Sequence, residues 1–267
     1  MVDPTRGVLY PARLPTFHRL PPAAEARDLV SWYWIPEWDL GPEESSPQDV
    51  IGYPAANLVV EPQGVSLVGP TTRAARRELR GRGWAVGALL RPAATAALAT
   101  DPAALVDSGR PLDAPDLHAA VCAAMASGHG HRERAAAATG TWLAARSGPP
   151  GEAARQANAM VDLLLGDATV RTPEQAAARL SVSVRTLQRM AHRFVGLPPA
   201  AIIRRRRLQE AAQAVRAGRA ADLAALAAEY GYADHAHLAN EFRAVLGLTP
   251  SEYRSVSGRS AGTPEEA

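Results

Sequence analysis

One helical pattern occurs twice in the last hundred residues of the chain, and each copy joins two helices through a tight turn. In the first copy, Thr172 opens a short helix, and residues 181–183 form the turn before a second helix over 184–194. In the second copy, residues 221–230 end at a glycine, and a second helix follows over 233–246. Glycine suits such a junction because it has no Cβ and accepts a positive φ. The repeat predicts two helix-turn-helix units within an all-α domain.

The second helix of the first unit has one apolar and one polar face. Leu187, Met190 and Phe194 recur at three- and four-residue spacing and predict the buried face. The polar face and its flank carry the candidate DNA contacts Arg185, Gln188, Arg189, His192 and Arg193. Arginine can pair with guanine and glutamine with adenine through two hydrogen bonds, each pair contributing roughly 1 to 3 kcal/mol of discrimination. A solvated basic face is the alternative, but the position after a helix and a turn favours base reading.

The second helix of the second unit is less basic. Leu238, Phe242 and Val245 predict its buried face. Its outer face carries two acids and three candidate base readers, which are Asp234, Glu241, His235, His237 and Asn240. Carboxylates repel DNA phosphates, so this unit either grips DNA less firmly or reads it through the two histidines and the asparagine with its acids turned aside.

A connecting helix over residues 200–217 contains four consecutive arginines, residues 204–207, which fan around the helix and cannot all face one partner. Arg204 and Arg205 are predicted to contact DNA, and others to be solvated or paired with Glu210. Residues 171–207 hold nine arginines and one acid, a local net charge of +8 in a chain whose total is +2. Concentrated positive charge of this kind favours DNA, because each neutralised phosphate releases condensed counterions.

These residues resemble a known family. The segment from about Glu152 to Arg254 resembles the DNA-binding domain of the AraC/XylS transcriptional regulators. The most specific part of the match is Ala227, Gly231, Tyr232, Asp234, Phe242, Gly247 and the closing segment 249–254. The resemblance implies two helix-turn-helix units joined by one long helix and placed in successive major-groove segments. It further implies that Arg185, Gln188 and Arg189 read bases in the first unit, and that His235, His237 and Asn240 occupy the reading face of the second.

The amino-terminal half has a different character. Proline and glycine are frequent up to about residue 112, and short apolar runs at 29–35, 56–60, 65–68 and 84–90 predict β-strands of a small barrel or sandwich. Residues 115–146 are alanine-rich and predict two antiparallel helices, which either pack on the barrel or supply a dimer interface. The predicted fold class is therefore α+β, with a β-rich N-terminal domain and an all-α C-terminal domain.

Tryptophans stand out in the N-terminal half. Trp32, Trp34 and Trp38 alternate along one predicted strand and are expected on one face, and Trp84 lies near a cluster of arginines. An aromatic wall of the β-domain core is the first interpretation. The second is a wall that faces a small-molecule ligand, with Trp84 as a fourth candidate contact, because such pockets are mostly apolar with a few polar groups.

The N-terminal half also resembles the cupin-like sensor domain that precedes this DNA-binding domain in some bacterial regulators. The resemblance rests on Tyr10–Pro11, residues 30–34, residues 91–94 and Pro111–Leu112. Metal-binding cupins use closely spaced histidines on barrel strands, whereas His18 stands alone, so no metal is expected. The predicted organisation is a sensor domain over 1–146, a linker over 147–151, the DNA-binding domain over 152–254 and a flexible tail over 255–267.

Composition narrows the alternatives. The single cysteine, Cys122, excludes an internal disulfide and suits a reducing cytoplasm, and no stretch approaches the roughly 20 apolar residues of a membrane helix. A DNA-repair methyl-acceptor enzyme would need a reactive cysteine, but Cys122 lies in an apolar helical stretch with no activating group nearby. A protein-interaction module without specific DNA reading would leave the polar face of the first unit unexplained.

The sequence therefore predicts a cytoplasmic bacterial transcription regulator that is not an enzyme and needs no cofactor. Its implied partners are double-stranded operator DNA, RNA polymerase, and a small-molecule effector or a second copy of the chain acting through the N-terminal domain. Activation and repression both remain open.

Overall fold

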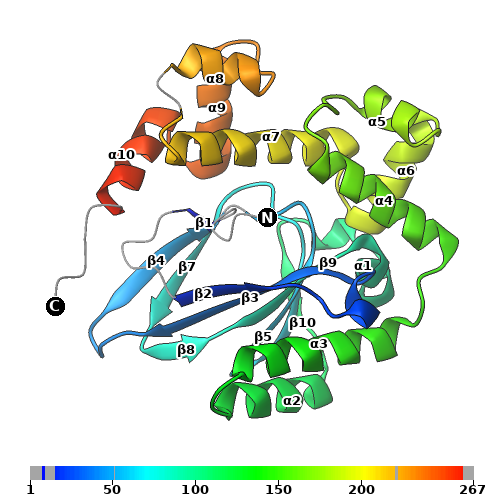
Figure 1. The fold of residues 1–267 in the computed structure, drawn as a ribbon, viewed down its shortest axis with the longest axis vertical. Helices are drawn as coiled ribbons and strands as arrows, with labels where there is room; N and C mark the ends of the chain where they lie inside the picture. The colour runs from blue at the N-terminus through cyan, green and yellow to red at the C-terminus, as the bar shows by residue number, and fades with distance from the viewer. Residues whose placement is uncertain (1–7, 10–15, 51, 220–221, 261–267) are drawn as a thin grey trace.

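The computed structural model describes residues 8–9, 16–50, 52–219 and 222–260. Two parts of different secondary structure are visible in Figure 1, a β-rich part with a helical pair and an all-helical part stretched across it. This arrangement confirms the predicted fold class. Tyr10 and Pro11, which contribute to the resemblance of the N-terminal half, lie outside the described residues.

The N-terminal part is built on antiparallel strands. The larger sheet has the order β10-β6-β5-β9-β3-β2, with β8 also paired to β3. Its strands are β2 (Thr16–Leu20), β3 (Val30–Asp39), β5 (Asn57–Glu61), β6 (Gly64–Val68), β8 (Arg82–Trp84), β9 (Val86–Leu90) and β10 (Gly109–Pro111). A smaller sheet contains β1 (Val8–Leu9), β4 (Ser45–Val50) and β7 (Ala75–Arg80) in the order β1-β4-β7. The four predicted apolar runs all fall on strands, because alternating or continuous apolar residues fill a sheet with a covered face.

The helical pair covers one face of the larger sheet. It consists of α2 (Pro115–Ala126) and α3 (His131–Ser147), separated by residues 127–130. Leu117 and Leu143 from these helices share one buried core with Tyr33 and Ile35 of β3. Of the two alternatives for the pair, packing on the sheet is therefore the one observed.

Shorter helical segments complete the N-terminal part. They are the 3₁₀ turns η1 (Ala24–Ala26) and η2 (Ala103–Leu105) and the helix α1 (Pro92–Leu98). The proline at the first position of α1 needs no N–H partner and fixes a helical φ. Helix α1 faces the C-terminal part of the chain.

The C-terminal part is helical throughout its described residues. Its helices are α4 (Glu152–Gly166), α5 (Pro173–Arg179), α6 (Val184–Val195), α7 (Pro199–Arg216), α8 (Leu223–Glu229), α9 (His235–Leu246) and α10 (Pro250–Ser260). Thr172 caps α5 in a reciprocal capping box with Gln175, as its position before an apolar run suggests. Residues 255–260 were predicted to be flexible and instead continue α10, whereas residues 261–267 lie outside the described residues.

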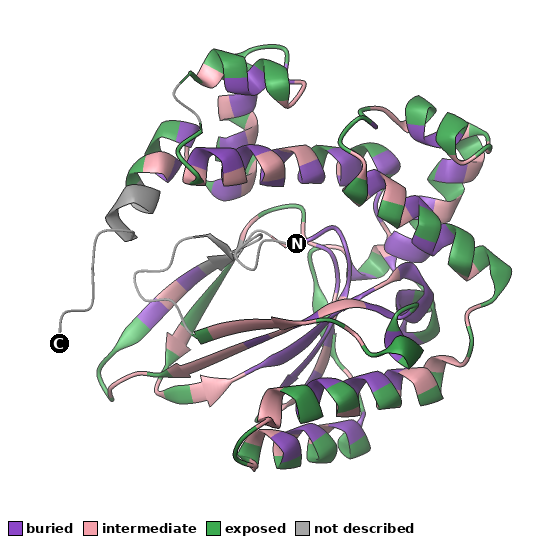
Figure 2. Cartoon of the chain, viewed as in Figure 1, coloured by how far each residue is buried: buried purple, intermediate pink, exposed green. Residues whose placement is uncertain are grey.

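The two helix-turn-helix units have separate apolar cores. We call α5 and α6 the first unit, and α8 and α9 the second unit. The core of the first unit includes Leu187 and Ile202, and the core of the second includes Leu208 and Phe242. Helix α7 thus contributes its first turn to one core and its remainder to the other, and the buried stripe along it is visible in Figure 2. Within the described residues, no helix is long and apolar enough to cross a membrane.

Candidate nucleic-acid interface

Helix α6 presents the polar face that its sequence predicts. Leu187 and Phe194 are buried, Met190 is half-buried, and the five candidate contacts Arg185, Gln188, Arg189, His192 and Arg193 are all exposed. Ser183 caps the helix by accepting a hydrogen bond from the Thr186 amide at 3.1 Å. Among the described residues, Arg185, Gln188 and Arg189 have no hydrogen-bond or ion-pair partner. These three exposed side chains therefore offer donor groups of the kind that pair with base edges.

The acids of the second unit are turned aside. Asp234 caps α9, because its Oδ1 accepts a hydrogen bond from the His237 amide at 2.7 Å. The Glu241 side chain is only 10% exposed, and its Oε1 lies 3.4 Å from Arg204 Nε. Burial raises the pKa of Glu241, and the nearby cations, Arg204 first, partly offset that rise. Glu241 is therefore held away from the outer face of α9, and one oxygen of the exposed Asp234 is engaged at the start of the helix.

The remaining side chains on α9 are exposed. His235, His237 and Asn240 all reach the surface, and His237 also packs edge-on against Tyr232 with 5.3 Å between ring centroids. Arg243, which the sequence analysis did not single out, donates to Asn240 Oδ1 at 3.1 Å. Its position three residues after Asn240 is the signal that identifies it, since residues at that spacing share a helix face. Arg243 supplies the second unit with a cation that its other candidates lack.

The four consecutive arginines of α7 have four different environments. Arg204 is exposed, with 64% of its side chain accessible, as expected for a DNA contact. Arg205 is only 6% exposed, and its Nη2 donates to Thr71 O of the N-terminal part at 2.8 Å. Its prediction as a DNA contact is therefore wrong for this conformation, because a neighbouring domain covers the side chain. Sequence periodicity cannot reveal this, since the covering residues lie more than a hundred positions away.

Arg206 and Arg207 hold the two units onto α7. Arg206 is fully buried and donates to Leu164 O at 2.9 Å and to Val170 O at 2.6 Å, on the segment that leads into the first unit. Arg207 Nε donates to Tyr230 O at 2.6 Å, in the turn of the second unit. Adjacent arginines of α7 thus bond to different parts of the domain, Arg206 to the segment before the first unit and Arg207 to the turn of the second unit.

The N-terminal part contacts the helix that precedes the first unit. Asn158 of α4 is buried, and its Oδ1 accepts from the Ala93 amide at 3.1 Å while its Nδ2 donates to Asp28 O at 2.8 Å. Arg91 forms an ion pair with Asp162 at 2.5 Å beside it. These bonds fix α4 against the start of α1.

The N-terminal part also contacts the second unit through the connection between β6 and β7. We call residues 70–74 the strap. The Ala74 amide donates to Val245 O of α9 at 2.7 Å, and the Thr72 amide and hydroxyl donate to the Asp107 carboxylate at 2.5 and 2.6 Å. A small cavity of about 30 Å³ lies between the strap, α7 and α9. Helix α1 also packs against α6, so the N-terminal part contacts both units.

Three of the four candidate tryptophans share a face, and the fourth does not. Trp34 Nε1 donates to Asn57 Oδ1 at 2.9 Å, Trp38 Nε1 donates to Arg80 O at 3.2 Å, and Trp32 packs edge-on against Tyr53. Trp84 pairs in register with Glu37, so it lies on the opposite, helix-covered face and packs against the main core. Trp84 is therefore not part of the face that the other three tryptophans share, because strand register decides its side.

Cys122 lies beside a histidine that the sequence analysis did not single out. It is half-buried, with Sγ 3.5 Å from His118 Nε2. Burial raises the pKa of the thiol, which is the opposite of what activates cysteine for attack. Over the described residues, no three His, Cys, Asp or Glu side chains gather as metal ligands do.

Comparisons with known proteins match both parts of the chain. Residues 176–255 match a family described as a helix-turn-helix domain, and residues 18–108 match a domain of unknown function (DUF6597). A protein from Streptomyces antibioticus, named as an AraC-like transcription regulator, is 34% identical over 124 residues. That match covers 46% of this chain and 39% of the relative, so the chain spans about two fifths of the relative's length.

Solved structures show a weaker likeness. The apo form of a ToxT variant from Vibrio cholerae is 10% identical with a TM-score of 0.44, and the match covers 89% of this chain and 99% of that one. The AraC-like transcriptional activator CuxR is 17% identical with a TM-score of 0.23, over 74% of this chain and 87% of that one. By its paired helix-turn-helix units, their matching family model and the Streptomyces relative, the C-terminal part of the chain is similar to AraC-like transcription regulators.

Proposed function

We propose that this protein binds operator DNA in a sequence-specific way and regulates transcription, with α6 and α9 as its reading helices. The observation that carries the proposal is the outward set of Arg185, Gln188 and Arg189. Donor groups without protein partners, on the helix that follows a helix and a turn, suit bidentate contacts with base edges. Phosphate contacts from Arg193, Arg204 and His192 would position the duplex without reading it.

In the second unit, the proposed readers are His235, His237 and Asn240, with Arg243 as an added phosphate contact. The engagement of Asp234 Oδ1 as a cap and the burial of Glu241 against Arg204 support this assignment, because they reduce the negative charge that α9 would present to the phosphates.

The N-terminal domain controls the reader in this proposal. Its contacts with both units support that role, since a change in the sensor domain that loosens Asn158 or the strap alters how α6 and α9 are held. The signal is a small-molecule effector or a second copy of the chain, and Trp32, Trp34 and Trp38 are the proposed wall of an effector site. RNA polymerase is the further partner that regulation implies, and the cytoplasm is the compartment.

Selection of bound fragments from genomic DNA with the full-length protein tests the DNA-reading proposal. The variant Arg185→Ala/Gln188→Ala/Arg189→Ala removes the readers and two positive charges. The control variant Arg27→Ala/Arg82→Ala also removes two positive charges, from exposed positions of the N-terminal part. Salt is held constant, because phosphate contacts respond steeply to it. We expect one enriched motif with the wild type and the control variant, and its loss with the reader variant. Uniform weak recovery by all three proteins would instead favour a protein-interaction module.

A further inference from the structure

The end of α8 depends on arginines from outside the second unit. The last carbonyls of a helix have no partner within it, and here they are Glu229 O, Tyr230 O and the following Gly231 O. Arg171 Nη2 donates to Glu229 O at 3.1 Å, Arg207 Nε donates to Tyr230 O at 2.6 Å, and Arg207 Nη2 donates to Gly231 O. Arg171 directly precedes the cap of α5, so a residue of the first unit's entry bonds to the second unit.

Local packing holds both arginines in these positions. The Arg207 guanidinium lies 4.5 Å from the centroid of the Tyr232 ring, a cation–π contact that orients the fork. Gly231 has a φ of +72°, and a Cβ placed there would lie 3.2 Å from Arg171 Nη1. Glycine at this turn therefore serves two needs, because it accepts the left-handed backbone and leaves room for the guanidinium of the other unit.

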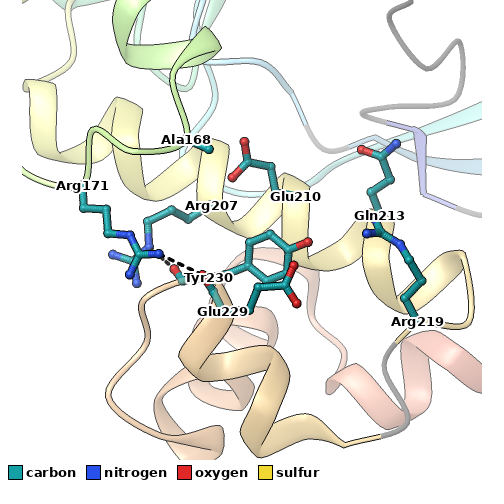
Figure 3. A pocket seen from close by; sticks show the side chains of 8 residues that line it. All are labelled: Ala168, Arg171, Arg207, Glu210, Gln213, Arg219, Glu229 and Tyr230. Carbon is teal, nitrogen blue, oxygen red and sulfur yellow. Dashed lines mark hydrogen bonds between the residues drawn. The ribbon is translucent and has the colours of Figure 1, made fainter.

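The gap that these arginines cross contains a cavity of about 340 Å³. Figure 3 shows Arg171 and Arg207 together at the end of the cavity nearest the Tyr230 turn, with Arg219 at the far end. The cavity is lined by Ala168, Arg171, Arg207, Glu210, Gln213, Arg219, Glu229 and Tyr230. Because its lining is mostly polar and charged, apolar packing does not join the two units here.

We propose that Arg171 and Arg207 form an inter-unit staple that fixes the distance and rotation between α6 and α9, and so determines which operator spacing the protein accepts. The two units have separate apolar cores that share only the rod of α7. Arg206 fixes one side of that rod to the segment before the first unit. Bending of α7, or a small shift of either core along it, would change the relative placement of α6 and α9. A bond between the two units would prevent that change.

Operator spacing is sensitive to such shifts. Successive major-groove segments lie one helical turn apart, roughly 34–36 Å and 10–10.5 base pairs. Adding one base pair between the two half-sites moves one of them by about 3.4 Å and rotates it by about a tenth of a turn. If the two units are held by the staple, the protein binds an operator of altered spacing more weakly. If the units move independently on α7, they adjust to the new spacing. The staple rests on the proposed DNA-reading function and adds a spacing requirement to it.

The test uses the full-length protein and operator libraries in which the two half-sites of the selected motif are separated by one base pair fewer, the native number or one more. Arg171→Ala removes the bond from the first unit's entry, Arg171→Lys keeps a donor, and Arg219→Ala removes the same charge from the same cavity without removing a bond to the turn. We expect Arg171→Ala to lower the discrimination between native and altered spacing by about tenfold, the effect of one charge-assisted hydrogen bond.

Arg171→Lys should restore part of that discrimination, and Arg219→Ala should match the wild type. An unchanged spacing profile for Arg171→Ala would overturn the staple, and so would an equal loss in Arg171→Ala and Arg219→Ala, which would indicate a charge effect. Thermal unfolding of each variant separates loss of fold from loss of spacing. If the wild type selects no motif at all, the proposed DNA-reading function is wrong. If the wild type selects a motif but accepts every spacing equally, only the staple is wrong.

Discussion

Asn158 of the C-terminal part caps the first helix of the N-terminal part, because its Oδ1 accepts a hydrogen bond from the Ala93 amide at 3.1 Å. The residue at the N-cap of α1, Arg91, provides no side-chain cap of its own. The side-chain oxygen of Asn158 on α4 therefore accepts a hydrogen bond from an N–H group in the first turn of α1. Such groups are usually bonded by a capping side chain at the start of their own helix. The start of α1 and the position of α4 are thereby coupled.

We predict that Asn158→Ala destabilises the full-length protein by about 1–3 kcal/mol, because it leaves the buried Ala93 amide and the partly buried Asp28 carbonyl without this partner. Urea unfolding of the full chain measures the change. Asn240→Ala, at an exposed position of α9, is the control and should stay within about 0.5 kcal/mol of the wild type. Equal unfolding curves for the two variants would show that Asn158 does not hold the domains together.

Arg204 and Arg205 are adjacent on α7, and we predict opposite effects of their removal. Arg204→Ala should weaken DNA binding across sequences and reduce the slope of affinity against salt by about 1, because one phosphate contact is lost. Arg205→Ala should leave that slope unchanged and lower the stability of the fold, because it frees Thr71 O and releases the strap. Fluorescence anisotropy titrations over a series of salt concentrations, together with urea unfolding, distinguish the two. A reduced salt slope for Arg205→Ala would place its side chain at the DNA.

Features that depend on local periodicity could be predicted from the sequence. The buried and exposed faces of α6 follow from the spacing of Leu187 and Phe194, and the shared face of Trp32, Trp34 and Trp38 follows from the two-residue repeat of a strand. Helix ends followed from the capping residues. In these cases the neighbours that decide a side chain's environment lie within about one turn or one strand of it.

Features that depend on distant contacts could not be predicted. The burial of Arg205 requires the strap, and the side of Trp84 requires the pairing of β8 with β3. The capping of helix α1 by Asn158 also comes from a helix more than sixty residues away in the sequence. The inward position of Glu241 likewise depends on Arg204 of α7 rather than on its own helix.

Gly87 leaves space for the indole of Trp34. The two residues are paired in register on β9 and β3, and a Cβ at position 87 would overlap the Trp34 ring. We predict that Gly87→Ala destabilises the protein by about 1–3 kcal/mol, because the ring must leave its rotamer and its bond to Asn57. Thermal unfolding and tryptophan fluorescence measure the effect. Gly128→Ala is the control, since a Cβ there has no neighbour within 4 Å, and an equal loss in both variants would contradict the packing argument.

Glu241 gives the fold a dependence on pH whose sign follows from its burial. Burial raises the pKa of this carboxyl above its ordinary value of 4.5, and the cations around it, chiefly Arg204, offset only part of the rise. The folded state therefore binds the proton more tightly than the unfolded state. The resulting stability is fully present below about pH 4.5, the ordinary value, and is lost as the pH rises through the raised pKa of the folded state.

We therefore predict that Glu241→Gln, which cannot ionise, gains stability over the wild type as the pH rises from about 4 to about 7.5. Urea unfolding of both proteins at the two pH values measures the gain, because the other titrating groups are common to both and cancel in the difference. A difference between Glu241→Gln and the wild type that stays constant, or shrinks, with rising pH would mean that Arg204 outweighs the cost of burying the charge.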